Sequence, residues 1–466
     1  MQRTRGRVAS FPALALGILA VVAPAAGQDE SPGLRRGALA LVEFLAHESA
    51  NASEFLEAHV ADALRERVEE AELEKRLAAL RRALLGASLD DRFPDGEHGS
   101  CLVYLLPGGG SAEVVARFEP APPHGLVDLW IEGGEHLDPA VRPEPLPPPL
   151  TWESLAQRMQ QEAAGGFAGV LLVVRDGATV LNEAWGLANR EKGIANTPET
   201  IFAIGSTPID FTKAAILLLD QDEILDLDQP ITDFFEDVPA DKRAITVRHL
   251  MTGGSGLQDF LGLPTDTDPD HFWIDRAEAV RRIFAQTLLF EPGRGRQHSH
   301  AAWGLLAAIV EIASETSYRD FTRELLFEPA GMTSTGFFGD PIDEQRCAVG
   351  YGMLRDGEVN VPPFWGPTSW LVLGSGGMVS TTGDMLRWLR TVRAGKILGP
   401  QAQALYWGPP GGVLAGGDVF GFEILYTEGP DTLFVLISNG IDASNRRRFN
   451  RLGKDLARLI SSPGGR

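Results

Sequence analysis

A serine at the start of a predicted helix is the first candidate for chemistry in this chain. The stretch FAIGSTPIDFTKAAILLL, residues 202–219, predicts a strand end, a tight turn at Gly205-Ser206 and then an apolar helix. A helix start exposes the serine hydroxyl and places it at the positive end of the helix dipole. Pro208 is tolerated there because the first amides of a helix have no intrahelical partner. We therefore expect Ser206 to be a nucleophile if a base reaches it.

The base that such a serine commonly uses is missing from its usual place. A lysine three residues after Ser206 would lie on the same helix face, but Ile209 occupies that position. Lys213 follows seven residues after the serine, which is about 10 Å along the axis of a helix. No Ser-x-x-Lys sequence occurs elsewhere in the chain. The sequence thus presents a nucleophile without its lysine.

Two histidines separated by one serine, His298 and His300, are the other candidates for proton transfer. Imidazole titrates near neutral pH and is a suitable base. The same pair is also a candidate metal site. Histidines two residues apart lie on opposite sides of a helix and share a metal only on a strand or loop, and no third ligand lies nearby in the sequence. We expect neither a metal nor a cofactor.

Charge limits the partners of this protein. The 466 residues carry a formal net charge of −21, which argues against binding to nucleic acid or to anionic membrane surfaces. A small-molecule, acyl or peptide ligand is the expected partner. The two cysteines, Cys101 and Cys347, are either paired with each other or buried as free thiols.

The N-terminus has the parts of a secretory signal. Arginines at the start are followed by an apolar stretch and by small residues before Gln28, so residues 1–27 are predicted to be a cleaved signal peptide. The apolar stretch is short for a membrane span, and we expect no span in the mature protein. The predicted location is secreted or periplasmic.

The remaining chain divides into two folded parts. Residues 33–136 begin with charged helical segments, up to about Gly86, and continue with three predicted strands, which indicates a small α+β domain, cystatin-like or similar to nuclear transport factor 2. Residues 137–150 are a proline-rich linker. In residues 151–466 strands occur at both ends and helices between them, including a hairpin with a turn at Asp176-Gly177.

Several stretches in the second part occur in the order seen in one family. They include GLANREKGIANTPETIFAIGS, ITVRHLMTGGSGL, FEPGRGRQHSHAAWGLL and GSGGMVSTTGDMLRWLR. In these stretches the chain resembles the serine β-lactamase and penicillin-binding-protein superfamily, on the branch that holds class C-like enzymes, esterases and D-aminopeptidases. The resemblance implies an α+β domain of the α/β-sandwich type, in which helices flank an antiparallel sheet beside a helical subdomain, and an active site between the two.

The resemblance also assigns positions to the three motifs of this family, and the chain departs from all three. Ser206 is retained, but Ile209 takes the lysine position. His298 and His300 fall on the tyrosine and asparagine of the second motif. In the third motif, Leu414 takes the place of the charged residue.

The backbone parts of the family site do not depend on these side chains. Gly416 belongs to the third motif, and the amide of Gly417 after it would form an oxyanion hole with the amide of Ser206. Ile209 and Leu414 would make the ligand cleft more apolar, with His300 as a wall residue.

Two functions follow from this pattern. The first is a pseudoenzyme, an exported relative of serine hydrolases that has lost most or all acyl transfer and has kept its ligand-binding cleft. We favour it because losing three motifs is simpler than replacing them in concert. The alternative is an active esterase- or peptidase-like hydrolase that uses a Ser206–His298 pair.

Overall fold

The computed structural model describes most of the chain after the first 31 residues. The described ranges are 32–46, 50–106, 111–132, 134–141, 147–259, 273–352, 360–362, 365–407, 415–427, 432–442 and 444–461. The predicted signal peptide, residues 1–27, and Leu414 lie outside them. Within the described ranges, no helix has both the length and the apolar character needed to cross a membrane.

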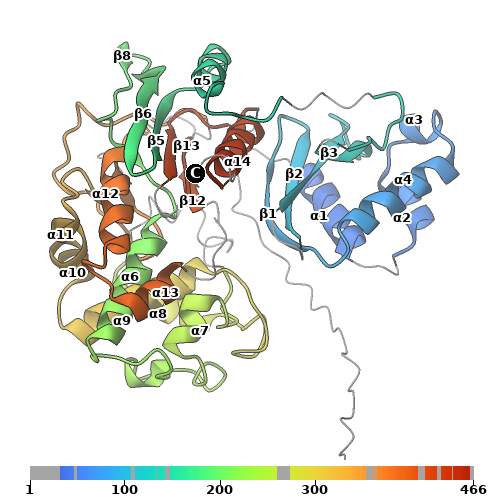
Figure 1. Ribbon diagram of the computed structural model, residues 1–466. Helices are drawn as coiled ribbons and strands as arrows, with labels where there is room; N and C mark the ends of the chain where they lie inside the picture. Colours follow the sequence, from blue (N-terminus) through green and yellow to red (C-terminus); the bar gives the residue numbers. More distant parts are fainter. Residues whose placement is uncertain are drawn as a thin grey trace, which may run out of the picture.

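A first sheet with its own helices forms the N-terminal unit (Figure 1). Its elements are α1 (Pro32–Ala46), α2 (Ala52–His59), α3 (Asp62–Arg65), α4 (Glu70–Ala83), β1 (Ser88–Pro94), β2 (Gly99–Leu105), β3 (Ser111–Phe118) and β4 (Leu126–Ile131). The four strands pair in chain order, all antiparallel. The sequence predicted β2, β3 and β4 but not β1. The helices and one face of this sheet share a separate apolar core.

The second sheet is five-stranded and is assembled from both ends of the second part of the chain. Its strands are β12 (Ala415–Val419), β13 (Phe422–Thr427), β14 (Leu433–Ser438), β5 (Gly169–Arg175) and β6 (Ala178–Trp185), in that order and antiparallel. The fold class is therefore confirmed. The predicted hairpin turn at Asp176-Gly177 is confirmed as well, because both residues have positive φ between the paired β5 and β6.

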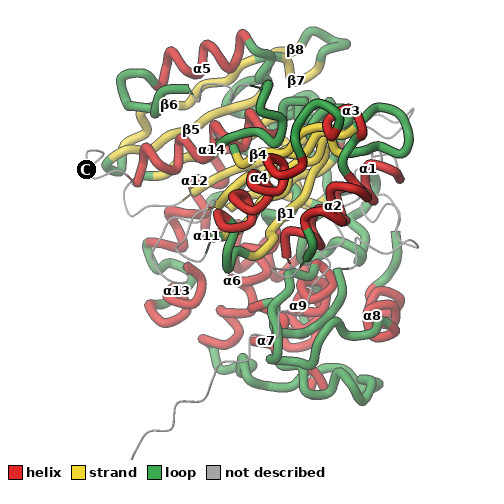
Figure 2. The backbone as a smooth tube through the Cα atoms, turned by 90° about the vertical axis from the view of Figure 1, so that its right-hand side faces the viewer, coloured by secondary structure: helices red, strands yellow, loops and turns green. Residues whose placement is uncertain are grey.

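Helices cover both faces of this sheet (Figures 1 and 2). On one face, α5 (Leu155–Ala164) and α14 (Arg446–Ser461) pack on Leu171, Val173 and Leu425. The larger core on the other face includes Val170, Leu172 and Ile424 together with the buried side of α6 (Pro208–Gln221).

The helical region lies between the strands in sequence. Its helices are α7 (Val247–Thr252), α8 (Arg276–Ala285), α9 (His300–Ser314), α10 (Tyr318–Thr322), α11 (Glu328–Ala330), α12 (Thr382–Arg393) and α13 (Pro400–Trp407). A 3-10 turn (Ile231–Asp233) and a π-helical turn (Arg323–Phe327) accompany them. The short strands are β7 (Leu187–Asn189), β8 (Ile194–Ala195), β9 (Phe202–Ala203), β10 (Gly336–Phe337) and β11 (Met378–Ser380).

The basic side of α14 contacts the N-terminal unit. Lys454 Nζ lies 2.5 Å from Glu113 Oε1, and Arg447 lies 3.2 Å from Asp95 Oδ2. The Glu113 side chain is only 1% exposed, so its charge depends on this cation. In the same unit Cys101 is a buried free thiol, and Cys347 in the second part is another.

Candidate active site

Ser206 lies at the entry to α6, as the sequence predicts. β9 leads into a turn in which Gly205 has φ of 50°, a conformation that glycine adopts without strain. Ser206 is half-buried at this turn, directly before Thr207 and the first helical residue, Pro208. The backbone therefore presents the Ser206 hydroxyl at the positive end of a helix of 14 residues.

The side chain that meets Ser206 is that of His300. Its Nε2 lies 3.1 Å from Ser206 Oγ, and its Nδ1 lies 3.0 Å from Asp259 Oδ1. The backbone N–H of His300 also donates to Asp259 Oδ1 at 3.3 Å. A hydroxyl, an imidazole and a carboxylate thus form one continuous chain of hydrogen bonds.

The carboxylate determines what the imidazole can do. A carboxylate only accepts hydrogen bonds, so the proton of neutral His300 lies on Nδ1 and Nε2 has its lone pair directed at Ser206. Nε2 can then accept the hydroxyl proton. This is the arrangement of a nucleophile, a base and an orienting acid.

The start of α9 places His300 and Asp259 together. Ser299 is the N-cap, with its Oγ accepting the N–H of Ala302 at 3.2 Å and donating to the carbonyl of Gln258 at 2.9 Å. Gln258 and the following residue, Asp259, are therefore fixed to the first turn of α9. A carboxylate beside the N–H groups of a helix start is also favoured by the helix dipole.

Electrostatics keep Asp259 ionised. Burial alone would raise the pKa of this carboxyl, but attraction to His300, hydrogen bonds from its ring and backbone, and attraction to His298 outweigh that effect. The net result is a pKa below the ordinary value of aspartate. Asp259 is accordingly a carboxylate over the pH range in which His300 can act as a base.

His298 does not hold the position that the sequence analysis gave it. The alternative of an active hydrolase pairs His298 with Ser206, whereas the structure gives that contact to His300. The intervening Ser299 is extended, with φ of −151°, and helical geometry begins at His300, so the two rings leave the backbone in different directions. They pack edge to face, with centroids 4.8 Å apart.

The surroundings keep His298 neutral. Its ring is exposed to solvent on one side, yet desolvation by the surrounding protein and repulsion by His300 lower its pKa to about 4. Attraction to Asp259 acts in the opposite sense and is weaker.

The edge strand β12 closes the site on the other side of Ser206. A Cβ added to Gly417 would lie 2.2 Å from the Ser206 nitrogen, so only glycine allows this approach. A Cβ on Gly416 would instead meet the carbonyl of Ile424, and Gly416 is exposed. Ile209 is half-buried against the main core.

Buried polar contacts fix the glycine segment 374–377 next to the turn that carries Ser206. Gly376 approaches the carbonyl of Gly205, at 3.4 Å from an added Cβ. On α6, Thr212 donates to the Gly374 carbonyl at 2.6 Å and contacts Tyr318 Oη at 2.5 Å. These contacts join α6, α10 and the glycine segment 374–377.

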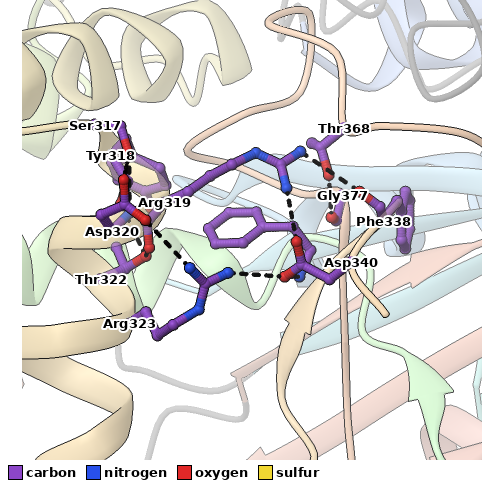
Figure 3. A network of polar contacts seen from close by, with 11 residues as sticks. Ser317, Tyr318, Arg319, Asp320, Thr322, Arg323, Phe338, Asp340, Thr368 and Gly377 are labelled. Atoms are coloured by element: carbon purple, nitrogen blue, oxygen red, sulfur yellow. Dashed lines mark hydrogen bonds and ion pairs between the residues drawn. The ribbon is translucent and has the colours of Figure 1, made fainter. Parts of the chain in front are cut away.

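The network in Figure 3 fixes the end of that glycine segment. The Gly377 carbonyl accepts from Thr368 Oγ1 at 2.6 Å and from the Phe338 N–H at 2.9 Å. Arg319 binds the neighbouring segment 338–340 of the same chain through Asp340, at 3.2 Å, and through the Phe338 carbonyl. These contacts make the glycine segment 374–377 a packing element.

Asp259 is the site residue that sequence reasoning missed. It lies 41 residues before His300, in a stretch without regular secondary structure, and no spacing rule connects the two. The only local sign was an acidic residue shortly after the family-like stretch TGGSGL.

A serine at a helix start, between the edge of an antiparallel sheet and a helical region, is the site arrangement of the β-lactamase-fold serine hydrolase family. The Beta-lactamase family model matches residues 154–429. The chain belongs to this family.

Named relatives span several activities. The chain is 26% identical over 311 residues to the putative penicillin-binding protein PbpX of Bacillus subtilis, covering 64% of this chain and 76% of that protein. It is 29% identical over 270 residues to the esterase EstB of Burkholderia gladioli, covering 50% of this chain and 68% of EstB.

A solved structure shares the fold. The D-amino acid amidase of Ochrobactrum anthropi SV3, solved in complex with L-phenylalanine amide, superposes with a TM-score of 0.56 at 25% identity. The match covers 66% of this chain and 96% of the amidase chain. The comparisons establish the family and leave the particular reaction open.

Proposed function

We propose that this protein is an active acyl-transferring serine hydrolase in which Ser206 is the nucleophile, His300 the general base and Asp259 the residue that orients the base. The observation that carries the proposal is the unbroken chain of hydrogen bonds from Ser206 through His300 to Asp259. It departs from the pseudoenzyme that the sequence analysis favours, and in the alternative of an active hydrolase it replaces His298 by His300.

The proposed reaction proceeds through an acyl-enzyme. As Ser206 Oγ attacks the substrate carbonyl carbon, its proton passes to His300 Nε2, and Asp259 stabilises the imidazolium. The carbonyl π electrons move to the oxygen, which the amides of Ser206 and Gly417 would bind. His300 then returns the proton to the leaving group as its bond to the acyl carbon breaks. Water, activated by the same imidazole, releases the acyl group and restores Ser206.

This mechanism does not need the missing lysine. Ile209, which packs against the main core, and Leu414 have no group that could transfer a proton, and the mechanism assigns them no acid–base role. A correctly placed base contributes about 10²–10⁴-fold to a rate, so an imidazole in contact with Ser206 matters more than the family motif.

The substrate we propose is a small acyl ester, amide or short peptide. The relatives named esterase, D-aminopeptidase and penicillin-binding protein support this range. The overall charge of −21 speaks against polyanionic substrates.

Active-site labelling tests the proposal. Native protein should gain the mass of one fluorophosphonate adduct on Ser206, and Ser206→Ala and heat-unfolded protein should gain none. Since phosphonylation needs an activated hydroxyl, unlabelled native protein would refute the assignment.

The replacement of the family's lysine by Ile209 and of its charged third-motif residue by Leu414 favours a second candidate, a catalytically silent ligand-binding protein. In that case native protein would resist the label, and β-lactams or D-Ala-D-Ala peptides would raise its melting temperature by mass action. A protein that is labelled and turns over an ester excludes this candidate.

We also propose export, on the basis of the basic, apolar and small-residue pattern of residues 1–27. N-terminal sequencing of protein from a secreting host should begin near Gln28. A mature chain that begins at Met1 would refute cleavage.

A further inference from the structure

One face of the second sheet meets the helix that carries Ser206. Side chains alternate along a strand, and on β13 Ile424 and Tyr426 join the core shared with α6, while Leu425 joins the core on the opposite face. Gly417 pairs with Ile424 across β12 and β13, so Gly417 lies on the α6 side too. Tyr426 and Gly417 therefore face the same helix.

Two contacts join that face to α6. The first is the close approach of Gly417 to the Ser206 nitrogen. The second is a hydrogen bond from the Tyr426 hydroxyl to Asp210 Oδ2. Asp210 was not among the residues that the sequence analysis selected.

The spacings of the two contacts match. From Ser206 to Asp210 is four residues, which is about 6 Å along a helix and slightly more than one full turn. On the sheet, Tyr426 pairs with Ala415, two residues from Gly417, which is about 7 Å along a strand. The contact of Tyr426 with Asp210 thus repeats the contact of Gly417 with Ser206 one turn further along α6.

The surroundings strengthen the second contact. Tyr426 is buried, at 3% exposure, and Asp210 is half-buried. Burial raises the pKa of the Asp210 carboxyl, against the lowering effects of the Tyr426 hydrogen bond and of Lys213. A hydrogen bond in such surroundings is stronger than one in water.

We propose that Asp210 and Tyr426 are positioning residues that hold the start of α6 against the edge of the sheet, so that the amides of Ser206 and Gly417 point at one oxyanion. The two amides belong to separate elements, and a small slide or rotation of α6 would separate them. The inference rests on the proposed function, because the oxyanion arises only in acyl transfer.

Three substitutions test the link, with p-nitrophenyl acetate as the probe substrate. Tyr426→Phe removes the hydroxyl and should lower kcat 10- to 100-fold, in the range below complete loss of an oxyanion-hole donor, while KM changes less than threefold. Asp210→Ala should reproduce this loss, which covers the case in which Tyr426→Phe does not fold. Asp210→Asn keeps an oxygen that accepts from Tyr426 and should stay within threefold of wild type.

Tyr351→Phe is the control. It removes another tyrosine hydroxyl that contacts a carboxylate, that of Glu191, and accepts from the Arg190 N–H at 2.6 Å, and neither partner belongs to α6. Its kcat should equal that of wild type.

The results separate the two proposals. Full kcat in Tyr426→Phe, alongside an inactive Ser206→Ala, would overturn the positioning role and leave the proposed function standing. If wild type itself shows no turnover, the proposed function fails. Amide hydrogen exchange then still tests whether the Asp210–Tyr426 contact holds the start of α6 against the sheet. Tyr426→Phe should accelerate exchange at both 206–210 and 415–419, and unchanged exchange in both segments would refute it.

Discussion

Replacing Asp259 by asparagine tests the proton arrangement at the site. Asparagine keeps the size of the side chain but carries no charge, and the backbone N–H and the ring Nδ1 of His300 both contact the same end of this side chain, the position of Oδ1. Its amide N–H₂ can donate to His300 Nδ1, which would move the ring proton to Nε2. Nε2 would then face Ser206 as a donor and could no longer accept the hydroxyl proton.

The structure sets the size of the effect. His300 Nδ1 lies 3.0 Å from Asp259 Oδ1, and His300 Nε2 lies 3.1 Å from Ser206 Oγ. Because both hydrogen bonds are formed, the wrong tautomer should remove most of the base catalysis. In a serine protease triad the equivalent change lowers kcat about 10⁴-fold, which corresponds to about 5 kcal/mol in the activation barrier. Stability should change little, since the lost attraction between a carboxylate and a helix start is about 0.3–1 kcal/mol.

Steady-state hydrolysis of p-nitrophenyl acetate, with a thermal melt of the same sample, measures both quantities. Asp228→Asn is the matched control, because Asp228 is an exposed carboxylate paired with Arg248 at 2.7 Å. An Asp259→Asn protein with a normal melt and activity within tenfold of wild type would refute the tautomer argument.

Three further predictions concern other parts of the molecule. His298→Gln should keep activity within tenfold. Because the pKa of His298 falls to about 4 in the folded protein, unfolding takes up a proton between pH 6.5 and 4, so wild type loses stability as pH falls through this window. The substitution should weaken that loss in pH-dependent melts, although solvent at the exposed ring limits its size; an identical pH dependence would contradict this. Gly417→Ala places a methyl group 2.2 Å from the Ser206 nitrogen and should lower kcat about 10²–10³-fold; normal kcat would count against the oxyanion hole. Lys454→Met leaves Glu113 buried without its cation and should destabilise the protein by about 3 kcal/mol in urea titrations; an unchanged midpoint would show that Glu113 has other compensation.

Local sequence was sufficient for the turn that carries Ser206 and for strands β2, β3, β4, β5 and β6. Gly205, Ser206 and Pro208 define a turn into a helix whatever packs around them, and Asp176-Gly177 specifies a hairpin by its own backbone preferences. Strand β1 is not predicted from the sequence, because SLDDRFP contains two aspartates, and aspartate is depleted in strands. It forms because β2 pairs with it, which is a tertiary effect.

The base and its partner could not be obtained in the same way. Choosing between His298 and His300 depends on the backbone at Ser299, where the cap of α9 begins. Asp259 reaches His300 only because Ser299 binds the carbonyl of Gln258. Contacts of this kind join segments far apart in the chain, and a single sequence carries no periodic signal for them.

Whether His300 activates Ser206 is best measured as the rate at which a fluorophosphonate modifies Ser206 in wild type and in His300→Gln. With His300 as the base, wild type should be labelled at Ser206, and His300→Gln should react at least 100-fold more slowly with an unchanged melting temperature. Equal rates in the two proteins would contradict the assignment of His300 as the group that activates Ser206.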